Sequence, residues 1–261
     1  MYGINLNSAT PLRLEPDHRS EMVSQVLFGE RFLFEDRRNH FCKITNERDQ
    51  YSGWMDEKAI TEISEQENRE LAEQMSYYAV TPLAEAFDLI TRCVIRIPAG
   101  SVLPHCDTIG KFSLHEKKFQ IHRDFILPES ELSREGLELT AFAFINTPYL
   151  WGGKTVLGMD CSGFVQLVFG LHGIRLPRDA GDQAETGIPI ALNDLASGDL
   201  VFFRNETGRV VHVGIALENQ HIIHASGRVK IDFLDEQGIY SEEYRDYTHQ
   251  YPFGRRMAVS S

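Results

Sequence analysis

The sequence predicts an α+β protein in which two small β-barrels precede a larger mixed α/β region. The first observation is a set of brief apolar or alternating runs, separated by turns, over residues 1–63. The second is the return of such runs over residues 90–127. The third is a change after residues 128–133, where helical patterns alternate with strand patterns to the end. We therefore divide the chain into residues 1–63, 64–130 and 131–261.

The two barrels are predicted from short strand-like segments that turn residues interrupt. Runs such as "MVSQVLFGERFLFEDR" and "YSGWMDEKAI" are broken by turn-forming residues, among them Pro16 and Gly29. Ser64, with Glu67 three residues later, has the pattern of a capping box, so a polar connecting helix is expected to begin there. The runs "TRCVIRIPAG" and "KFQIHRDFIL" then predict a second, degenerate barrel.

Composition excludes several classes of function. The net charge is −12 and no Lys/Arg face is concentrated, which argues against a nucleic-acid partner. No apolar run is long enough for a membrane-spanning helix. The four cysteines show no CxxC pairing, so neither structural zinc nor any other metal or cofactor is expected. Scattered cysteines and a start without a leader pattern favour a cytoplasmic location, with a periplasmic or secreted one if a leader was removed.

Cys161, in "GMDCSGFVQLVF", is predicted to stand at the first position of a helix. Apolar residues follow it at helical spacing, Asp160 is a good N-cap, and Gly173 is a plausible stop. The N-terminal end of a helix favours a thiolate, so Cys161 is a candidate nucleophile. A small buried core residue is the alternative interpretation, and a nucleophilic thiol also needs a base.

His212 and His224 are the candidate partners of the thiol. His212 lies in the alternating run "VVHVGIAL" beside the small residue Gly214, and His224 lies in "HIIHAS". A two-residue turn between these strands would send the two rings to opposite faces of the sheet. A triad of Cys161, His212 and His224 therefore requires an odd-length loop or a bulge near residues 217–222.

Several motifs, in order, resemble the NlpC family of papain-like cysteine peptidases, which act on bacterial cell-wall peptides. They are "TPYLWGGKTVLGMDCSGFVQLVF", "LASGDLVFF", "HVGIAL" and "IIHASG", and they cover about residues 133–256. In the front half, "EPDHRSEMVSQVLFGE" and "YSGWMDEK" resemble bacterial SH3-like domains. The resemblance implies a papain-like cysteine peptidase domain preceded by two small SH3-like β-barrels.

The resemblance also implies roles for individual residues. Cys161 would be the nucleophile, His212 the general base and then acid, and His224 the group that orients His212. Tyr149 would lie at the oxyanion site with the Cys161 backbone N–H. The implied or candidate substrate-binding residues are Asp160, Ser162, Tyr51, Glu21 (with Glu15 as its alternative), Trp151 (with packing as its alternative) and Arg178 (as a ligand for a substrate carboxylate or as a surface ion pair).

The subgroup that the chain resembles hydrolyses the γ-D-Glu–diamino-acid bond of murein peptides with a free N-terminal L-Ala. We therefore expect release of L-Ala-γ-D-Glu from a murein-derived peptide by a protein that is a monomer. Two alternatives stay open: an amidase or acyltransferase on the same thiol core, and a non-catalytic module that binds cell wall. After "LPR" many relatives have Thr-Ser, where this chain has Asp179-Ala180, which leaves the preferred diamino acid open.

Overall fold

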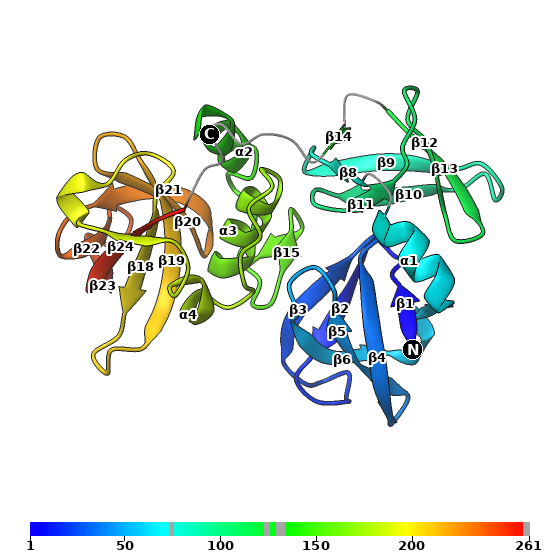
Figure 1. The fold of residues 1–261 in the computed structure, drawn as a ribbon. Coiled ribbons are helices and arrows are strands. Elements are labelled where there is room, and N and C mark those ends of the chain that lie inside the picture. The colour runs from blue at the N-terminus through cyan, green and yellow to red at the C-terminus, as the bar shows by residue number, and fades with distance from the viewer. Residues whose placement is uncertain (74–75, 123–125, 129–133, 258–261) are drawn as a thin grey trace. The chain divides into compact units, whose positions relative to one another are not determined.

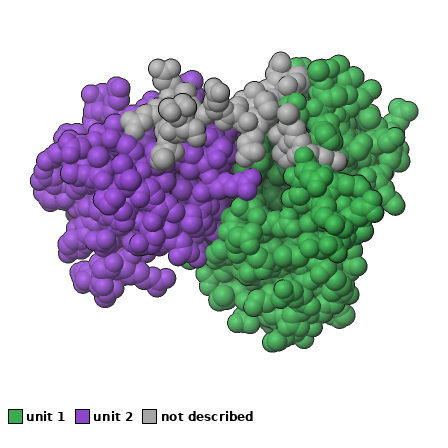
Figure 2. Space-filling model, in the orientation of Figure 1, with its two compact units in different colours: residues 1–130, 151–156 green, residues 131–150, 157–261 purple. Residues whose placement is uncertain are grey.

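The computed structural model describes residues 1–73, 76–122, 126–128 and 134–257. These form two compact units, coloured separately in Figure 2. Unit 1 comprises Met1–Ser130 and Trp151–Val156, and unit 2 comprises Glu131–Leu150 and Leu157–Ser261. No helix in the described part of the chain has the length and apolar character needed to cross a bilayer.

The first part of unit 1 is an antiparallel β-structure with an apolar interior. Its seven-stranded sheet has the order β3-β2-β6-β5-β4-β1-β7 (Figure 1). The strands are β1 (Tyr2–Ile4), β2 (Ala9–Arg13), β3 (Met22–Leu27), β4 (Arg31–Arg38), β5 (Phe41–Asn46), β6 (Ser52–Asp56) and β7 (Thr61–Ile63), with a 3₁₀ turn at Glu57–Ala59. Alternation along these strands places Leu12, Val26, Phe32, Phe34 and Met55 in one buried core, as predicted for a small barrel.

The capping box at Ser64 is confirmed on its Ser64 side. Helix α1 (Glu65–Glu73) begins directly after Ser64, whose Oγ accepts a hydrogen bond from the Glu67 N–H at 3.1 Å. The helix is predominantly polar, and Asn68 is its buried residue. It connects the first barrel to the second part of unit 1.

The second part of unit 1 consists of two small antiparallel sheets. Their orders are β10-β9-β13-β12 and β11-β8-β14. The strands are β8 (Ser76–Ala79), β9 (Leu83–Asp88), β10 (Val94–Pro98), β11 (Val102–Pro104), β12 (Lys111–Leu114), β13 (Lys117–Ile121) and β14 (Ile126–Pro128). Phe112 and Phe119 share a core with Ile4 and Phe28 of the first part, so the two parts form one unit. That the second part is itself an SH3-like barrel stays a prediction.

Unit 2 is an eight-stranded antiparallel sheet with helices. The strand order is β17-β24-β18-β19-β20-β21-β22-β23, drawn from yellow to red in Figure 1. The elements are α2 (Arg134–Phe142), β16 (Gly158–Met159), α3 (Cys161–Gly170), α4 (Ala180–Gln183), β17 (Ile188–Ile190), a 3₁₀ turn (Leu192–Asp194), β18 (Leu200–Arg204), β19 (Val210–Leu217), β20 (His221–Ser226), β21 (Arg228–Leu234), β22 (Gly238–Ser241), β23 (Asp246–Gln250) and β24 (Pro252–Arg256). Strand β15 (Lys154–Thr155) belongs to unit 1. Helix α3 packs against β19 and β20, which positions the candidate site.

Candidate active site

Helix α3 presents Cys161 at its first position, as predicted. Asp160 has extended backbone (φ −90°, ψ 178°) and its Oδ1 accepts the Gly163 N–H at 2.7 Å, which is N-cap geometry. The helix ends at Gly170, three residues before the predicted stop. Gly173 instead adopts φ +78° in the turn that follows.

Arg178 holds the two residues that flank the thiol. Its Nη2 donates to Asp160 Oδ2 at 2.6 Å, and its Nη1 donates to Asp160 Oδ1 at 3.0 Å and to Ser162 Oγ at 2.9 Å. The Arg178 side chain is buried, with 1% of its surface exposed. The interpretation of Arg178 as a ligand for a substrate carboxylate is therefore corrected, because its guanidinium is committed to Asp160 and Ser162. Arg178 is instead a positioning residue.

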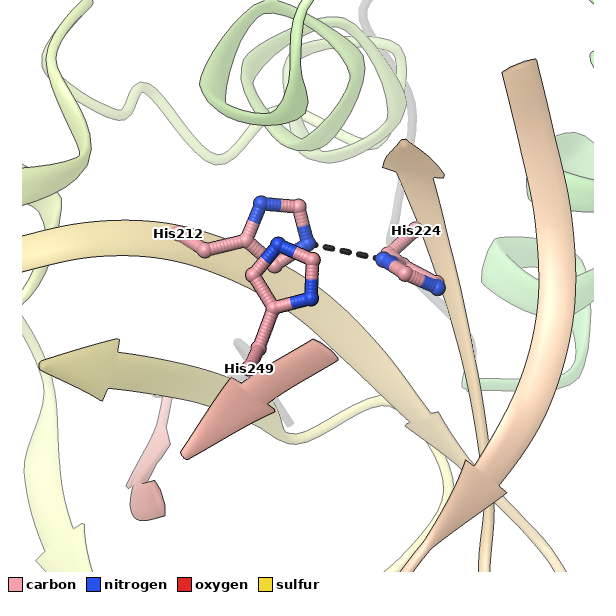
Figure 3. Close-up of side chains that lie close together, drawn as sticks. All are labelled: His212, His224 and His249. Atoms are coloured by element: carbon pink, nitrogen blue, oxygen red, sulfur yellow. Dashed lines mark hydrogen bonds between the residues drawn. The ribbon is translucent and has the colours of Figure 1, made fainter. Parts of the chain in front are cut away.

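His212 and His224 lie on the same face of the sheet because the loop between their strands has an odd length. Leu217 pairs with His221, so residues 218–220 form a three-residue loop, and Asn219 and Gln220 have positive φ. His212 Nε2 and His224 Nδ1 are 2.7 Å apart (Figure 3). The connection therefore has the odd length that the sequence analysis required for a pairing of the two histidines.

Gly214 gives His224 the space that it needs. A Cβ built on Gly214 would lie 2.9 Å from the His224 Cβ and 2.7 Å from a methyl carbon of Ile222. A side chain at position 214 would therefore push the His224 ring out of line with His212.

The thiol meets strand β19 at the residue after His212. The Val213 backbone N–H is hydrogen-bonded to the Cys161 sulfur. His212 uses Nε2 for His224, so Nδ1 is the nitrogen left to face another partner. The structure thus pairs His212 with His224 and places Cys161 beside the residue that follows His212, and all three residues are buried.

The resting pair is a neutral thiol and a neutral imidazole. Burial, reinforced by the Asp160 carboxylate, raises the pKa of Cys161 to about 11. Burial also lowers the pKa of His212 well below its usual value, and the neighbouring His249 and His224 add to the effect. The predicted preference of the helix end for a thiolate does not decide this state, because burial raises the pKa of Cys161 by more than the Val213 and Ser162 backbone hydrogen bonds lower it.

Comparison with known proteins matches two separate regions of the chain. Residues 146–249 match the NlpC/P60 family, and residues 12–60 match the bacterial dipeptidyl-peptidase SH3 domain. The chain therefore carries an NlpC/P60 cysteine peptidase domain together with a bacterial SH3 domain.

Known proteins resemble this chain in sequence and in fold. A γ-D-glutamyl-L-lysine dipeptidyl-peptidase of Bacillus subtilis (strain 168) is 28% identical over 219 residues, 77% of this chain and 71% of the relative. Dipeptidyl-peptidase 6 of Lysinibacillus sphaericus is 37% identical over 115 residues, 42% of this chain and 40% of the relative. The crystal structure of an NlpC/P60 family protein from Bacillus cereus ATCC 10987 has a TM-score of 0.86 at 22% identity, covering 98% of this chain and 99% of that one, which shows a common fold.

Tyr149 lies near the thiol of the NlpC/P60 domain. Burial, followed by the electrostatic influence of the neighbouring Cys161 and Asp160 side chains, raises the pKa of the Tyr149 phenol above its usual range. The hydroxyl is therefore protonated at neutral pH and can donate a hydrogen bond. This matches what an oxyanion-site residue must do, and the role itself stays a prediction.

The predicted substrate residues of unit 1 include a hydrogen-bonded pair. Trp151 Nε1 donates to Glu21 Oε1 at 2.6 Å, and both residues are exposed. Glu15 lies in the same β2–β3 connection as Glu21. Tyr51 is half-buried and packs against the core of the first barrel. The structure thus joins Glu21 to Trp151, and substrate contact by these residues stays a prediction.

Sequence patterns did not identify two residues that contact the histidine pair, namely Asp232 and His249. Asp232 Oδ2 lies 3.0 Å from His224 Nε2 and 2.8 Å from Lys230 Nζ. The signal was available: Lys230 and Asp232 alternate on a strand that pairs with β20. His249 stacks on His212 with ring centroids 3.9 Å apart (Figure 3). No motif marked His249, because β23 reaches the site through pairings that local patterns do not show.

Proposed function

We propose that the chain hydrolyses the bond between γ-D-Glu and the following diamino acid in murein peptides with a free N-terminal L-Ala, releasing L-Ala-γ-D-Glu. The observation that supports the chemistry is the hydrogen-bonded row of His212, His224 and Asp232 on β19, β20 and β21, next to Val213, whose N–H is bonded to the Cys161 sulfur at the start of α3. The names of the Bacillus relatives support the substrate class.

The arrangement fits acyl transfer by a thiol. As the sulfur attacks the γ-carbonyl carbon, Nδ1 of His212 accepts the Cys161 proton, so charge forms only when substrate is present. The Cys161 backbone N–H and the Tyr149 hydroxyl would hold the oxyanion, each donor contributing roughly 3–4 kcal/mol to transition-state stabilisation. His212 then returns the proton to the leaving amine as the C–N bond breaks. Water attacks the thioester carbon and gives a proton to His212, which passes it to the sulfur as the C–S bond breaks, so L-Ala-γ-D-Glu leaves and the thiol is regenerated.

We also propose the source of the selection for a free N-terminus. Glu21 carries an exposed carboxylate held by Trp151, and such a group can pair with a substrate ammonium. Acetylation of the substrate would remove that charge and leave the carboxylate without its partner. We further propose that the second part of unit 1 is a degenerate SH3-like barrel.

We also propose that the chain recycles wall peptides in the cytoplasm. Four cysteines without a disulfide suit that reducing compartment.

Mass spectrometry of the products tests the proposal. Peptides of the form L-Ala-γ-D-Glu-diamino acid, with and without an acetylated N-terminus, are incubated with the wild type and with Cys161→Ala. We expect the wild type to release L-Ala-γ-D-Glu from the free peptide alone, and Cys161→Ala to release none. The exposed cysteine provides the control, because Cys93→Ala should cleave like the wild type. Cleavage by Cys161→Ala would refute the nucleophile, and equal cleavage of the acetylated peptide would refute the selection.

A further inference from the structure

Three imidazoles from three strands meet beside the thiol. His212, His224 and His249 come from β19, β20 and β23, and one nitrogen of each lies within 4.8 Å of the others. In Figure 3 one nitrogen of His249 lies on the same side of the stacked rings as His212 Nε2, the side that faces His224. His249 is partly exposed, whereas the other two rings are buried, so the cluster opens to solvent along His249.

This donor set suits a transition-metal ion of the zinc type. Neutral imidazole is a ligand that zinc prefers, and three imidazoles leave a fourth position open. His224 also has a carboxylate on its other nitrogen, because Asp232 Oδ2 lies 3.0 Å from Nε2. A carboxylate behind a ligating histidine fixes the tautomer and raises the basicity of the ligating nitrogen.

The distances show what an ion would displace. Two nitrogens bound to one zinc ion lie about 3.3 Å apart, from Zn–N bonds of about 2.0–2.1 Å in a tetrahedral arrangement. His212 Nε2 and His224 Nδ1 are 2.7 Å apart, a hydrogen-bond distance. An ion would therefore replace the shared proton and spread the two rings slightly, and the stacked His249 ring would tilt toward it.

The charges around the cluster nearly cancel before an ion arrives. Asp232 and Lys230 face the cluster from β21 and form an ion pair at 2.8 Å. Lys230 opposes a cation and Asp232 attracts one, so affinity depends chiefly on the three ring nitrogens.

We propose that His212, His224 and His249 form a binding site for a zinc ion, and that occupation of this site takes His212 out of the peptidase reaction. The bound ion replaces the His212–His224 hydrogen bond and turns His212 from a base into a ligand. Zinc would then act as a reversible inhibitor that is held by the base rather than by the thiol.

Direct binding to the Cys161→Ala protein tests the site without the thiol and without any assay of activity. Zinc affinity is measured by competition with a chromophoric chelator. We expect one tight site per chain, and we expect His249→Phe in the same background to weaken it by at least about tenfold, the scale on which even outer-shell changes act. Phe keeps the stacked ring without the nitrogen, and His249→Gln serves as a second variant of smaller volume.

His221→Ala is the matched control, because His221 is an exposed histidine on the same strand as His224. Its zinc affinity should equal that of the parent protein. Loss of the tight site in Cys161→Ala would overturn the proposal, since zinc would then sit on the thiol. Unchanged affinity in both His249 variants would overturn it as well.

Inhibition of the wild type gives the second readout and rests on the proposed function. Zinc should inhibit peptide cleavage, a chelator should restore it, and His249→Phe should require at least about tenfold more zinc relative to its own uninhibited rate. Binding without inhibition would refute the functional half. Failure to cleave any murein peptide would count against the proposed function and leave the binding result standing.

Discussion

Opposing influences on Cys161 set its resting state. The start of α3 and the Val213 N–H favour a thiolate, whereas burial and the Asp160 carboxylate favour the thiol. With a pKa of about 11, the sulfur is protonated at neutral pH. The nucleophile is therefore generated during attack, by transfer to a histidine that is itself neutral.

Alkylation kinetics should reveal this neutral pair. At pH 7 a thiol with a pKa of about 11 is ionised in only about one molecule in ten thousand, and that fraction rises tenfold per pH unit. We expect the iodoacetamide rate constant of Cys161 to climb from about pH 6 to about pH 10 without a plateau. Cys93→Ala removes the exposed competing thiol from the measurement. A rate that stays flat over that range would reveal a thiolate–imidazolium pair instead.

Asp232 decides which nitrogen of His212 carries the proton. Burial alone would raise the pKa of Asp232, but hydrogen bonds from His224 and Lys230 outweigh it and lower that pKa, so the carboxylate is ionised. It accepts from His224 Nε2–H, which leaves His224 Nδ1 to accept from His212 Nε2–H. His212 Nδ1 is then unprotonated and can accept the Cys161 proton.

Replacing Asp232 by Asn should reverse this chain of hydrogen bonds. An amide can donate to His224 Nε2, which places the protons on His224 Nδ1 and on His212 Nδ1, the wrong tautomer for a base. We expect kcat to fall roughly a thousandfold with KM little changed, since a tautomer error acts on the chemical step. Asp232→Ala, which cannot donate, should be less severe. An Asn variant more active than the Ala variant would contradict the tautomer assignment.

At the scale of elements, the entrance of α3 depends on one buried ion pair. Asp160 caps the helix and also accepts two hydrogen bonds from Arg178, which in turn holds Ser162. Both partners of the ion pair are buried. Removal of the guanidinium would take away the bidentate ion pair of this buried carboxylate at the first turn of the helix.

Arg178→Met should therefore destabilise unit 2 by about 3–5 kcal/mol, and Arg178→Lys by less, because Lys keeps the charge but not the bidentate geometry. Differential scanning calorimetry of the whole chain measures the change. Arg209→Met, at an exposed arginine of unit 2, is the control and should have little effect. A Met variant with wild-type stability would show that Asp160 does not depend on Arg178.

Sequence patterns predicted the elements whose signals are local. The start of α3 could be predicted because Asp160, Cys161 and the apolar spacing are adjacent in the chain. The relation between His212 and His224 could only be stated as a condition on loop parity, because Asn219 and Gln220 adopt positive φ without being glycine. His249 depends on the pairing of β23 with β22, a tertiary event that periodicity does not encode.

At the scale of the whole molecule, the predicted domain boundary between residues 130 and 131 misses a return of the chain to unit 1 at residues 151–156. Residues 151–156 follow Tyr149 in the catalytic motif, yet they belong to unit 1. Gly152 has φ +76°, and a Cβ there would lie 2.2 Å from the Met22 carbonyl oxygen, so this close approach requires glycine. A sequence motif groups residues that are adjacent in the chain, but it does not show which structural unit each of them packs in.

Lys154 anchors this segment inside unit 1. Its buried Nζ lies 3.8 Å from Glu30 Oε1 and 3.6 Å from Asp49 Oδ2, and both carboxylates are buried. Glu30 Oε2 accepts hydrogen bonds from the Leu27 N–H and from Asn46 Nδ2, whereas Oε1 has no hydrogen-bond partner within the described residues. The ammonium therefore compensates a charge that hydrogen bonds alone leave partly unsatisfied.

Lys154→Met should destabilise unit 1 by about 3–5 kcal/mol, since it removes the ammonium that lies within ion-pair distance of two buried carboxylates. Tryptophan fluorescence during urea unfolding isolates this effect, because the chain has two tryptophans, Trp54 and Trp151, and both belong to unit 1. The exposed Lys58→Met is the control. If Lys154→Met unfolded at the same urea midpoint as the control, the charge on Lys154 would contribute nothing to holding residues 151–156 in unit 1. Contacts of the backbone, such as the hydrogen bond from the Lys154 N–H to Gln25 Oε1 at 2.8 Å, would then hold them instead.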